Sequence, residues 1–446
     1  MFFMKHILIG FVIFFIGCGG GGSGNSGDDS SNNDNDTTSQ EWVWEKAKIT
    51  EIDGGGMLTP NIIASKGNAH DVHIVYFEDD TANGYAINHL IVDDSAFTVS
   101  AEDKILSVDN CRTLGVSGAA SGTPVVAYQG GEIRECGSEQ QSDAMISIWS
   151  GNAWTEYTAG IGYVERNPVF QDGLAGKTVA TAMDSKGDIH VCYQFFYEGC
   201  DAMNFNFPDL LYVKKDGANL SAASAEEVVT GNVYNPNGTA SEQNRIGDRV
   251  AIMVDENDAP VIFYDADLSP VMPDPDEKGL RVSRKTGDRF EHAWIETGIK
   301  VAYLSCAMDK DGNPAVAYYI EDEYEDTTGT HEKCLKFAIL KNDQWTVQMV
   351  DESVLCGNYC SLSFDQNGNP WIAYYAEGNH SGSISMKDLK VAYDDGTAWK
   401  KEVVSETGDI GSFNTLWFDT DNMARICSYE KVGKAIYMFV QREGGQ

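Results

Sequence analysis

Carboxylates are concentrated in two stretches of the chain that follow apolar runs. Asp265, Asp267, Asp274, Asp276 and Glu277 belong to the first stretch, and Glu321, Asp322, Glu323, Glu325 and Asp326 belong to the second. Crowded carboxyl groups raise one another's pKa unless water or cations screen them, and their oxygen atoms suit calcium. Three interpretations stay open: solvated acidic loops, weak calcium binding, and a carboxylate pair that cleaves glycosidic bonds. The regular EF-hand spacing is absent.

A further calcium candidate is the aspartate pair Asp309 and Asp311 in the turn Asp309-Lys-Asp-Gly312. Similar turns occur as Asp184-Ser-Lys-Gly187 and Asp365-Gln-Asn-Gly368. An aspartate that accepts backbone hydrogen bonds, followed by a glycine at positive φ, is ordinary turn chemistry. We therefore expect these turns to be structural, with calcium as the alternative at Asp309 and Asp311.

Cys18 follows the apolar run from Ile7 to Ile16, which is too short to cross a bilayer and is typical of a signal-peptide core. Phe15-Ile16-Gly17-Cys18 resembles the bacterial lipobox, in which the cysteine becomes the acylated first residue of the mature protein. The resemblance implies removal of residues 1–17 and a lipid on Cys18. Because Gly19 follows the cysteine instead of aspartate, it also implies the outer membrane or cell surface as the destination.

The other nine of the ten cysteines fall into two groups. Cys306 and Cys427 lie inside apolar runs, and we expect buried thiols there. The remaining seven lie in or beside predicted loops, where disulfides would hold an exported protein together. These seven are Cys111, Cys136, Cys192, Cys200, Cys334, Cys356 and Cys360. Scattered histidines and the lack of a CxxC pair argue against zinc.

Aromatic and basic residues supply the remaining ligand candidates. Loop aromatics can stack on a ligand, although packing of the loop on itself is the simpler interpretation; they are Phe195, Phe196, Tyr197, Phe205, Phe207 and Tyr324. Four arginines lie at or just before the starts of predicted inner strands, namely Arg112, Arg166, Arg245 and Arg249. They keep a hydrolase that pairs arginines with carboxylates under consideration.

The elements that position these residues are short β-strands in a repeated order. The stretch from Cys360 to Val404 contains four β-type segments with tight turns after the first and third and a long polar loop between the second and third. One tyrosine closes the second segment of each copy: Tyr76, Tyr128, Tyr193, Tyr264, Tyr318, Tyr374 and Tyr429. These tyrosines are expected to pack between sheets.

The two ends of the chain complement each other. Residues 44–52 form a lone strand, whereas the last repeat has segments one to three and lacks the fourth. Closing the ring with the N-terminal strand removes the free sheet edge. The sequence thus predicts an all-β, seven-bladed β-propeller of four-stranded antiparallel sheets within residues 41–446. Residues 18–40 would be a flexible Gly/Ser/Asn/Asp linker that reaches roughly 25 Å.

Loops between the second and third segments are long and unlike one another, and they leave the ring at the same end as the connections between sheets. We call this end the variable face and expect it to carry function. Its candidate ligand-binding residues are Asp265, Asp267, Asp274, Asp276, Glu321, Glu323, Tyr324, Phe205 and Phe207.

The repeat Ser363-Phe-Asp365-Gln-Asn-Gly368-Asn-Pro-Trp371-Ile-Ala-Tyr374 resembles those of sialidase-like propellers with BNR or Asp-box-like repeats, which occur in bacterial surface lipoproteins. One extra residue separates Asp365 from Gly368, and the Arg-Ile-Pro motif is missing, so no catalytic arginine triad carries over. The resemblance implies a propeller and leaves activity open.

The net charge argues against some classes of binding partner. The chain has 32 basic and 68 acidic side chains and a formal charge of −36. Like-charged phosphates disfavour nucleic acid, and contact with the membrane is expected through the lipid anchor alone. We favour a non-enzymatic module that binds a glycan or a surface protein; a sialidase-like or other glycan-cleaving hydrolase is the alternative. Calcium is the one cofactor under consideration.

Overall fold

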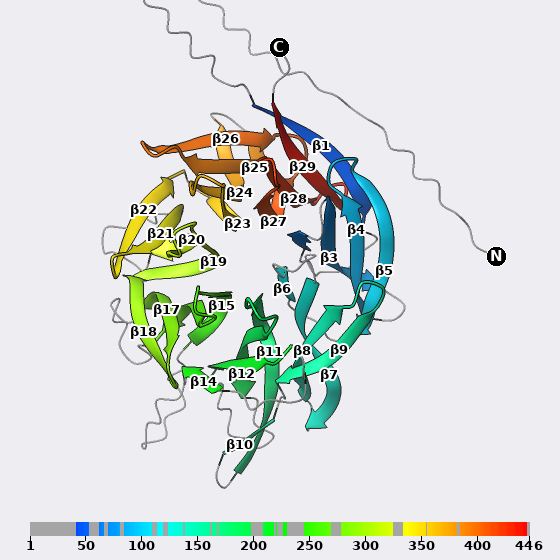
Figure 1. Ribbon diagram of the computed structural model, residues 1–446, viewed down its shortest axis with the longest axis vertical. Helices are drawn as coiled ribbons and strands as arrows, with labels where there is room; N and C mark the ends of the chain where they lie inside the picture. Colours follow the sequence, from blue (N-terminus) through cyan, green and yellow to red (C-terminus); the bar gives the residue numbers. More distant parts are fainter. Residues whose placement is uncertain are drawn as a thin grey trace, which may run out of the picture.

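In the computed structural model, seven blades of β-strands surround a central axis, with no helix in the part of the chain described (Figure 1). The second and third blades are joined into one nine-stranded sheet. Within the described residues, then, no segment could cross a membrane as a helix. The predicted signal peptide, Cys18 and the linker lie outside them. The described residues are 42–52, 62–66, 70–80, 84–108, 114–118, 124–136, 139–160, 163–166, 169–197, 208–217, 220, 226–229, 245–268, 278–323, 333–353, 355–380 and 384–443.

Each blade is a meander that runs outward from the axis. Blade 1 contains β2 (Ile62–Lys66), β3 (Asp71–Asp80), β4 (Gly84–Asp93) and β5 (Thr98–Val108). Blade 2 contains β6 (Leu114–Gly118), β7 (Pro124–Cys136), β8 (Glu139–Trp149) and β9 (Trp154–Gly160). Blade 3 contains β11 (Val169–Met183), β12 (Ile189–Tyr197), β13 (Pro208–Lys215) and β14 (Glu226–Val229), with β10 (Tyr163–Arg166) paired to β11.

The last four blades follow the same order. Blade 4 contains β15 (Arg245–Val254), β16 (Pro260–Asp267), β17 (Lys278–Thr286) and β18 (Arg289–Thr297). Blade 5 contains β19 (Ile299–Met308), β20 (Pro314–Glu323), β21 (Cys334–Lys341) and β22 (Gln344–Asp351). Blade 6 contains β23 (Cys356–Phe364), β24 (Pro370–His380), β25 (Ile384–Asp394) and β26 (Trp399–Ser405). Blade 7 contains β27 (Ile410–Phe418), β28 (Ala424–Glu430), β29 (Ala435–Glu443) and β1 (Trp42–Glu51).

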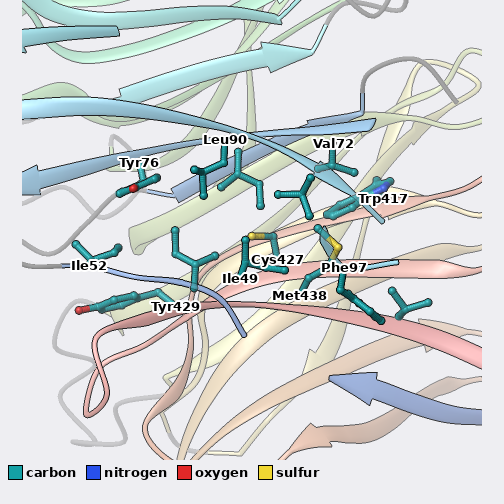
Figure 2. Close-up of a cluster of buried hydrophobic side chains, with 14 residues drawn as sticks. Ile49, Ile52, Val72, Tyr76, Leu90, Phe97, Trp417, Cys427, Tyr429 and Met438 are labelled. Carbon is teal, nitrogen blue, oxygen red and sulfur yellow. The ribbon is translucent and has the colours of Figure 1, made fainter. Parts of the chain in front are cut away.

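Ring closure follows the prediction. The N-terminal strand β1 pairs antiparallel with β29, from Trp42 opposite Glu443 to Glu51 opposite Ala435. Ile49 and Ile52 are buried in a cluster with side chains of blade 7 and blade 1, as Figure 2 shows. The strand therefore completes the last sheet and also fills the layer between the first and last blades.

The seven aligned tyrosines all lie on the second strand of a blade and are at most 7% exposed. Two of their hydroxyl groups bond to carboxylates: Tyr374 donates to Asp351 Oδ2 at 2.8 Å, and Tyr318 donates to Glu296. Both acceptors belong to the preceding blade. The prediction that these tyrosines pack between sheets is confirmed, and they do not form a ligand platform.

The turns between first and second strands share one hydrogen-bond pattern. The carboxylate of Asp309 accepts the backbone N–H groups of Asp311 (2.9 Å) and Asn313 (2.8 Å), and the same arrangement recurs at Asp184, Asp255 and Asp419. Gly312 has φ +80°, as expected for this turn. The carboxylate of Asp311, the second calcium candidate, forms an ion pair with Lys310, with Oδ1 and Nζ 2.9 Å apart. Among the described residues, no group of three or more His, Cys, Asp or Glu is placed to hold a metal ion.

The cysteines require a correction. Cys192, Cys356 and Cys360 have free thiols, so the predicted disulfides are not formed there. All three face the layers between blades, where they pack as small apolar side chains, and burial raises the pKa of Cys356 to about 11. Cys334 is buried in such a layer too, as is Cys427, whereas Cys306 is half-buried. Cys111 and Cys200 lie outside the described residues, and the side chain of Cys136 is not described.

A buried histidine pair joins blades 1 and 2. Trp154 Nε1 donates to His89 Nδ1 at 3.2 Å, so the proton of neutral His89 is on Nε2, which donates to His73 Nδ1 at 2.8 Å. A second proton on His89 would have to sit on Nδ1, where it would face the indole N–H group of Trp154. Burial, and then the neighbouring His73, lower the pKa of His89 to about 3.

We expect this pair to make the fold acid-sensitive. Because the pKa of His89 is lowered in the folded state, its contribution to stability is complete above the unfolded pKa near 6.5 and is lost as the pH falls, by about 2 kcal/mol at pH 5. Urea unfolding at several pH values should show a shallower pH slope for His89→Gln than for the native chain. The matched control is His70→Gln, at a more exposed histidine of the same blade; equal slopes for His89→Gln and the native chain would contradict the prediction.

Candidate functional site

The innermost strands of blades 4 to 7 are irregular near their first residues. Pairing with the second strand shifts register between Ile246 and Val250 in β15, between Lys300 and Tyr303 in β19, and more than once within β23 and β27. The beginning of an inner strand lies beside the end of the second strand, from which the long loop leaves. These bulges therefore lie on the variable face, beside the axis, and bulges of this kind redirect side chains.

The bulges bring one residue of each blade together. Each lies six positions before the aspartate that begins the first turn: Arg249, Tyr303, Tyr359 and Phe413. We call these four residues the axial cluster. The rings of Tyr303 and Tyr359 are 4.5 Å apart, and those of Tyr359 and Phe413 are also 4.5 Å apart. Three aromatic rings from three successive blades thus form a continuous, half-exposed row.

Two members of this row have an uncommon backbone conformation. Tyr359 has φ +53° and Phe413 has φ +54°, a region that bulky residues rarely adopt. Such a conformation costs about 1–3 kcal/mol and persists where the surrounding structure enforces it, most often at functional sites. Its repetition at equivalent positions of two neighbouring blades marks the row as a built feature.

Glycines two residues earlier make the row sterically possible. A Cβ atom on Gly357 would lie 2.8 Å from the Tyr319 ring and 2.9 Å from Leu335 Cβ. One on Gly411 would lie 3.0 Å from the carbonyl oxygen of Asp388, and both glycines have positive φ. Glycine lets each inner strand pass close to the preceding blade, which brings the following aromatic residue to the axis.

Arg249 forms one end of the row. Its guanidinium carbon lies 5.5 Å from the centre of the Tyr303 ring, while Nε donates to the Ala302 carbonyl and an Nη atom donates to the Asp248 carbonyl at 3.0 Å. The backbone N–H of Arg249 donates to Asp265 Oδ1 at 2.7 Å. The guanidinium is fixed by neutral carbonyl groups and keeps its positive charge beside the aromatic row.

Lys431 lies beside the middle ring of the row, with its ammonium group 5.6 Å from the centre of the Tyr359 ring. Burial, with a further contribution from Tyr303, raises the pKa of the Tyr359 phenol, so it stays neutral. Lys300 pairs with Glu321 at 2.8 Å, and this ion pair is the largest cause that lowers the pKa of Glu321. The axial cluster and the residues beside it therefore combine apolar ring faces, hydroxyl groups, cations and the carboxyl groups of Asp265 and Glu321.

The sequence-based candidates are only partly brought together here. Asp265 and Glu321 lie beside the cluster, whereas Asp267 pairs with Lys278 at 3.0 Å. Side chains of the others are not described: Asp274, Asp276, Glu323, Tyr324, Phe205 and Phe207. The same holds for Arg112, Arg166 and Arg245, which leaves Arg249 as the described arginine of that set.

Sequence reasoning missed the three aromatic members of the axial cluster. A signal for them was present as a second phase of the repeat, in which glycine occurs eight residues and a large side chain six residues before the turn aspartate. Gly247-Asp-Arg249, Gly357-Asn-Tyr359 and Gly411-Ser-Phe413 follow it. Blade 5 has Val301 in place of the glycine and still presents Tyr303.

Comparison with known proteins agrees on the fold. No family model and no curated protein matches the chain. An ulvan lyase, a polysaccharide lyase, aligns over 86% of this chain and 94% of its own, at 10% identity and a TM-score of 0.52. An α-L-arabinanase from Penicillium chrysogenum covers 89% and 97% (10% identity, TM-score 0.48), and a Trypanosoma rangeli sialidase covers 77% and 56% (10% identity, TM-score 0.41). The alignment with the ulvan lyase agrees with the β-propeller fold, and at this identity the likeness concerns the fold alone.

Proposed function

We propose that the protein is a membrane-anchored binding module that recognises a glycan through the variable face, with the axial cluster as its centre. The observation that carries the proposal is the row of Tyr303, Tyr359 and Phe413, two of which are held at positive φ. Aromatic faces pack against the C–H faces of sugars, while fixed polar groups at the edge orient hydroxyls. The fold shared with a polysaccharide lyase supports this ligand class.

We favour binding over cleavage because of the two described carboxylates beside the axial cluster, Asp265 and Glu321. Hydrolysis of a glycosidic bond needs a protonated acid with a raised pKa beside a second carboxylate. Beside the axial cluster, Asp265 accepts a backbone N–H group, and Glu321 is paired with Lys300 and has a lowered pKa. These two carboxylates, among the described residues, are better suited to holding a ligand in a rigid site than to transferring a proton in catalysis. A glycan-cleaving hydrolase stays the alternative, and a surface protein the alternative partner.

Tyr359→Ala is the sharpest test. We expect the native protein to bind members of a glycan array, with and without calcium, and the variant to lose at least about tenfold in affinity because the middle ring of the row is gone. Tyr393→Ala, in the same blade but on its third strand, is the matched control and should bind as the native chain does. Equal binding by Tyr359→Ala would contradict the proposal. Turnover of chromogenic glycosides would replace it with the hydrolase.

We further propose that Cys18 anchors the protein. Several acyl chains give stable membrane attachment, since each buried methylene contributes about 0.8 kcal/mol. Cys18→Ser should move the protein from the membrane fraction to the soluble fraction while leaving its thermal unfolding unchanged. Native protein found in the soluble fraction with an unmodified N-terminus would contradict the anchor.

A further inference from the structure

Polar groups continue outward from the axial cluster along the junction of blades 6 and 7. We call this strip the 6/7 seam; it consists of Tyr375, Glu377, Lys387, Asp409 and Lys431. Tyr375 is the aromatic ring next to Tyr359, at 6.2 Å between centres. The ammonium group of Lys431 lies 5.6 Å from the Tyr359 ring and 4.7 Å from the Tyr375 ring, so it bridges the cluster and the seam.

Asp409 holds three other residues of the seam in position. Asp409 is buried, and its carboxylate accepts the Tyr375 hydroxyl at 2.9 Å and the Lys387 ammonium group at 2.9 Å. The backbone N–H of Lys431 donates to the Asp409 carbonyl at 2.8 Å. Asp409 thus holds the Tyr375 ring, the Lys387 ammonium group and the backbone of Lys431, which come from two strands and a turn. Preorganisation of this kind lowers the entropy lost on binding.

The outer groups of the seam reach solvent, and Lys431 is partly exposed as well. The side chain of Lys387 is 36% exposed and that of Glu377 is 37% exposed, with Nζ and Oε1 3.9 Å apart. Lys387 lies between Asp409 and Glu377, so the outer part of the seam presents a donor and an acceptor side by side with no excess of positive charge. This suits the hydroxyl groups of a neutral sugar better than a carboxylate or a sulfate.

We propose that the 6/7 seam is a second sugar subsite, so that the ligand is an oligosaccharide that extends from the axial cluster and places a neutral sugar residue over Lys387 and Glu377. The inference rests on the proposed glycan-binding function. Lys431, Lys387 and Glu377 contact this second residue, while Tyr375 and Asp409 are positioning residues. Affinity then depends on chain length, which a single-sugar site would not show.

The test uses the full folded chain and neutral cello-, manno- and xylo-oligosaccharides, each from monosaccharide to hexasaccharide. Calorimetric titration should show affinity that rises about tenfold once the chain is long enough to reach the seam, since hydrogen bonds to charged groups are worth about that factor. Lys387→Met and Glu377→Gln should each remove most of that gain and leave the affinity for the shortest ligand unchanged. Lys310→Met, a lysine on the opposite face, is the matched control and should keep the whole gain.

The possible results separate the two proposals. Binding that depends on Tyr359 but does not change with chain length overturns the seam subsite and leaves the axial cluster intact. The same holds for a gain in affinity that both seam variants retain, or for binding restricted to uronate-containing chains. If no glycan of the array binds, both proposals fail. Glu377→Gln keeps the size of the side chain and leaves the Lys387–Asp409 pair in place. It therefore tests the seam subsite even if Lys387→Met lowers the stability of the fold.

Discussion

Removal of residues 41–53 is expected to destroy the cooperative fold of the whole ring. The deletion takes away β1, and with it the pairing to β29 and the buried side chains of Ile49 and Ile52. Burial of two such side chains stabilises by about 3–6 kcal/mol, a large part of the 5–15 kcal/mol that typical domains have. The edge of β29 would also be open to pairing with other chains.

Thermal unfolding followed by circular dichroism measures this effect. The truncated chain should melt far below the native protein or aggregate on purification, whereas a chain that lacks residues 1–40 alone should melt as the native protein does. A synthetic peptide of residues 41–53 added to the truncated chain should restore part of the stability, because it can occupy the same edge. Unchanged melting after deletion of 41–53 would show that closure by β1 is not needed.

The architecture could be predicted from the sequence because it depends on local and repeated features. Alternating apolar residues fix strand faces, turn aspartates fix strand ends, and the tyrosine phase from Tyr76 to Tyr429 gives the number of blades. The incomplete last repeat then assigns the N-terminal strand to it. These signals come from the local pattern of each repeat and from comparing one repeat with the next, and the structure confirms them.

The axial cluster could not be predicted in the same way, because it depends on contacts between repeats. A bulge on β23 is set by the approach of Gly357 to Tyr319 of the preceding blade, which no single repeat contains. The same limit explains the cysteines. Position beside a loop suggested disulfides for Cys356 and Cys360, whereas packing against the neighbouring blade places both thiols in a core layer.

Arg425 occupies the position where four of the other repeats have proline, beside the junction of the last and first blades. It is 3% exposed, and its guanidinium contacts Asp419 of its own blade and lies 3.5 Å from Asp94 Oδ2 of blade 1. Asp94 is 1% exposed and is held in turn by His70, whose Nδ1 lies 3.0 Å from Oδ1. The buried ion pair therefore holds blade 7 to blade 1, in addition to the chain, which continues from β1 of blade 7 to β2 of blade 1.

Arg425→Met is expected to lower the free energy of unfolding by about 3–5 kcal/mol at neutral pH, because it leaves the carboxylates of Asp94 and Asp419 buried without their cation. Chemical denaturation measures the loss. The double variant Arg425→Met/Asp94→Asn should recover much of it, since replacing a buried pair by neutral groups is often tolerated where breaking it is not. An additive loss in the double variant would mean that Arg425 stabilises the ring through packing of its aliphatic stem alone, and that the charge pair does not join blade 7 to blade 1.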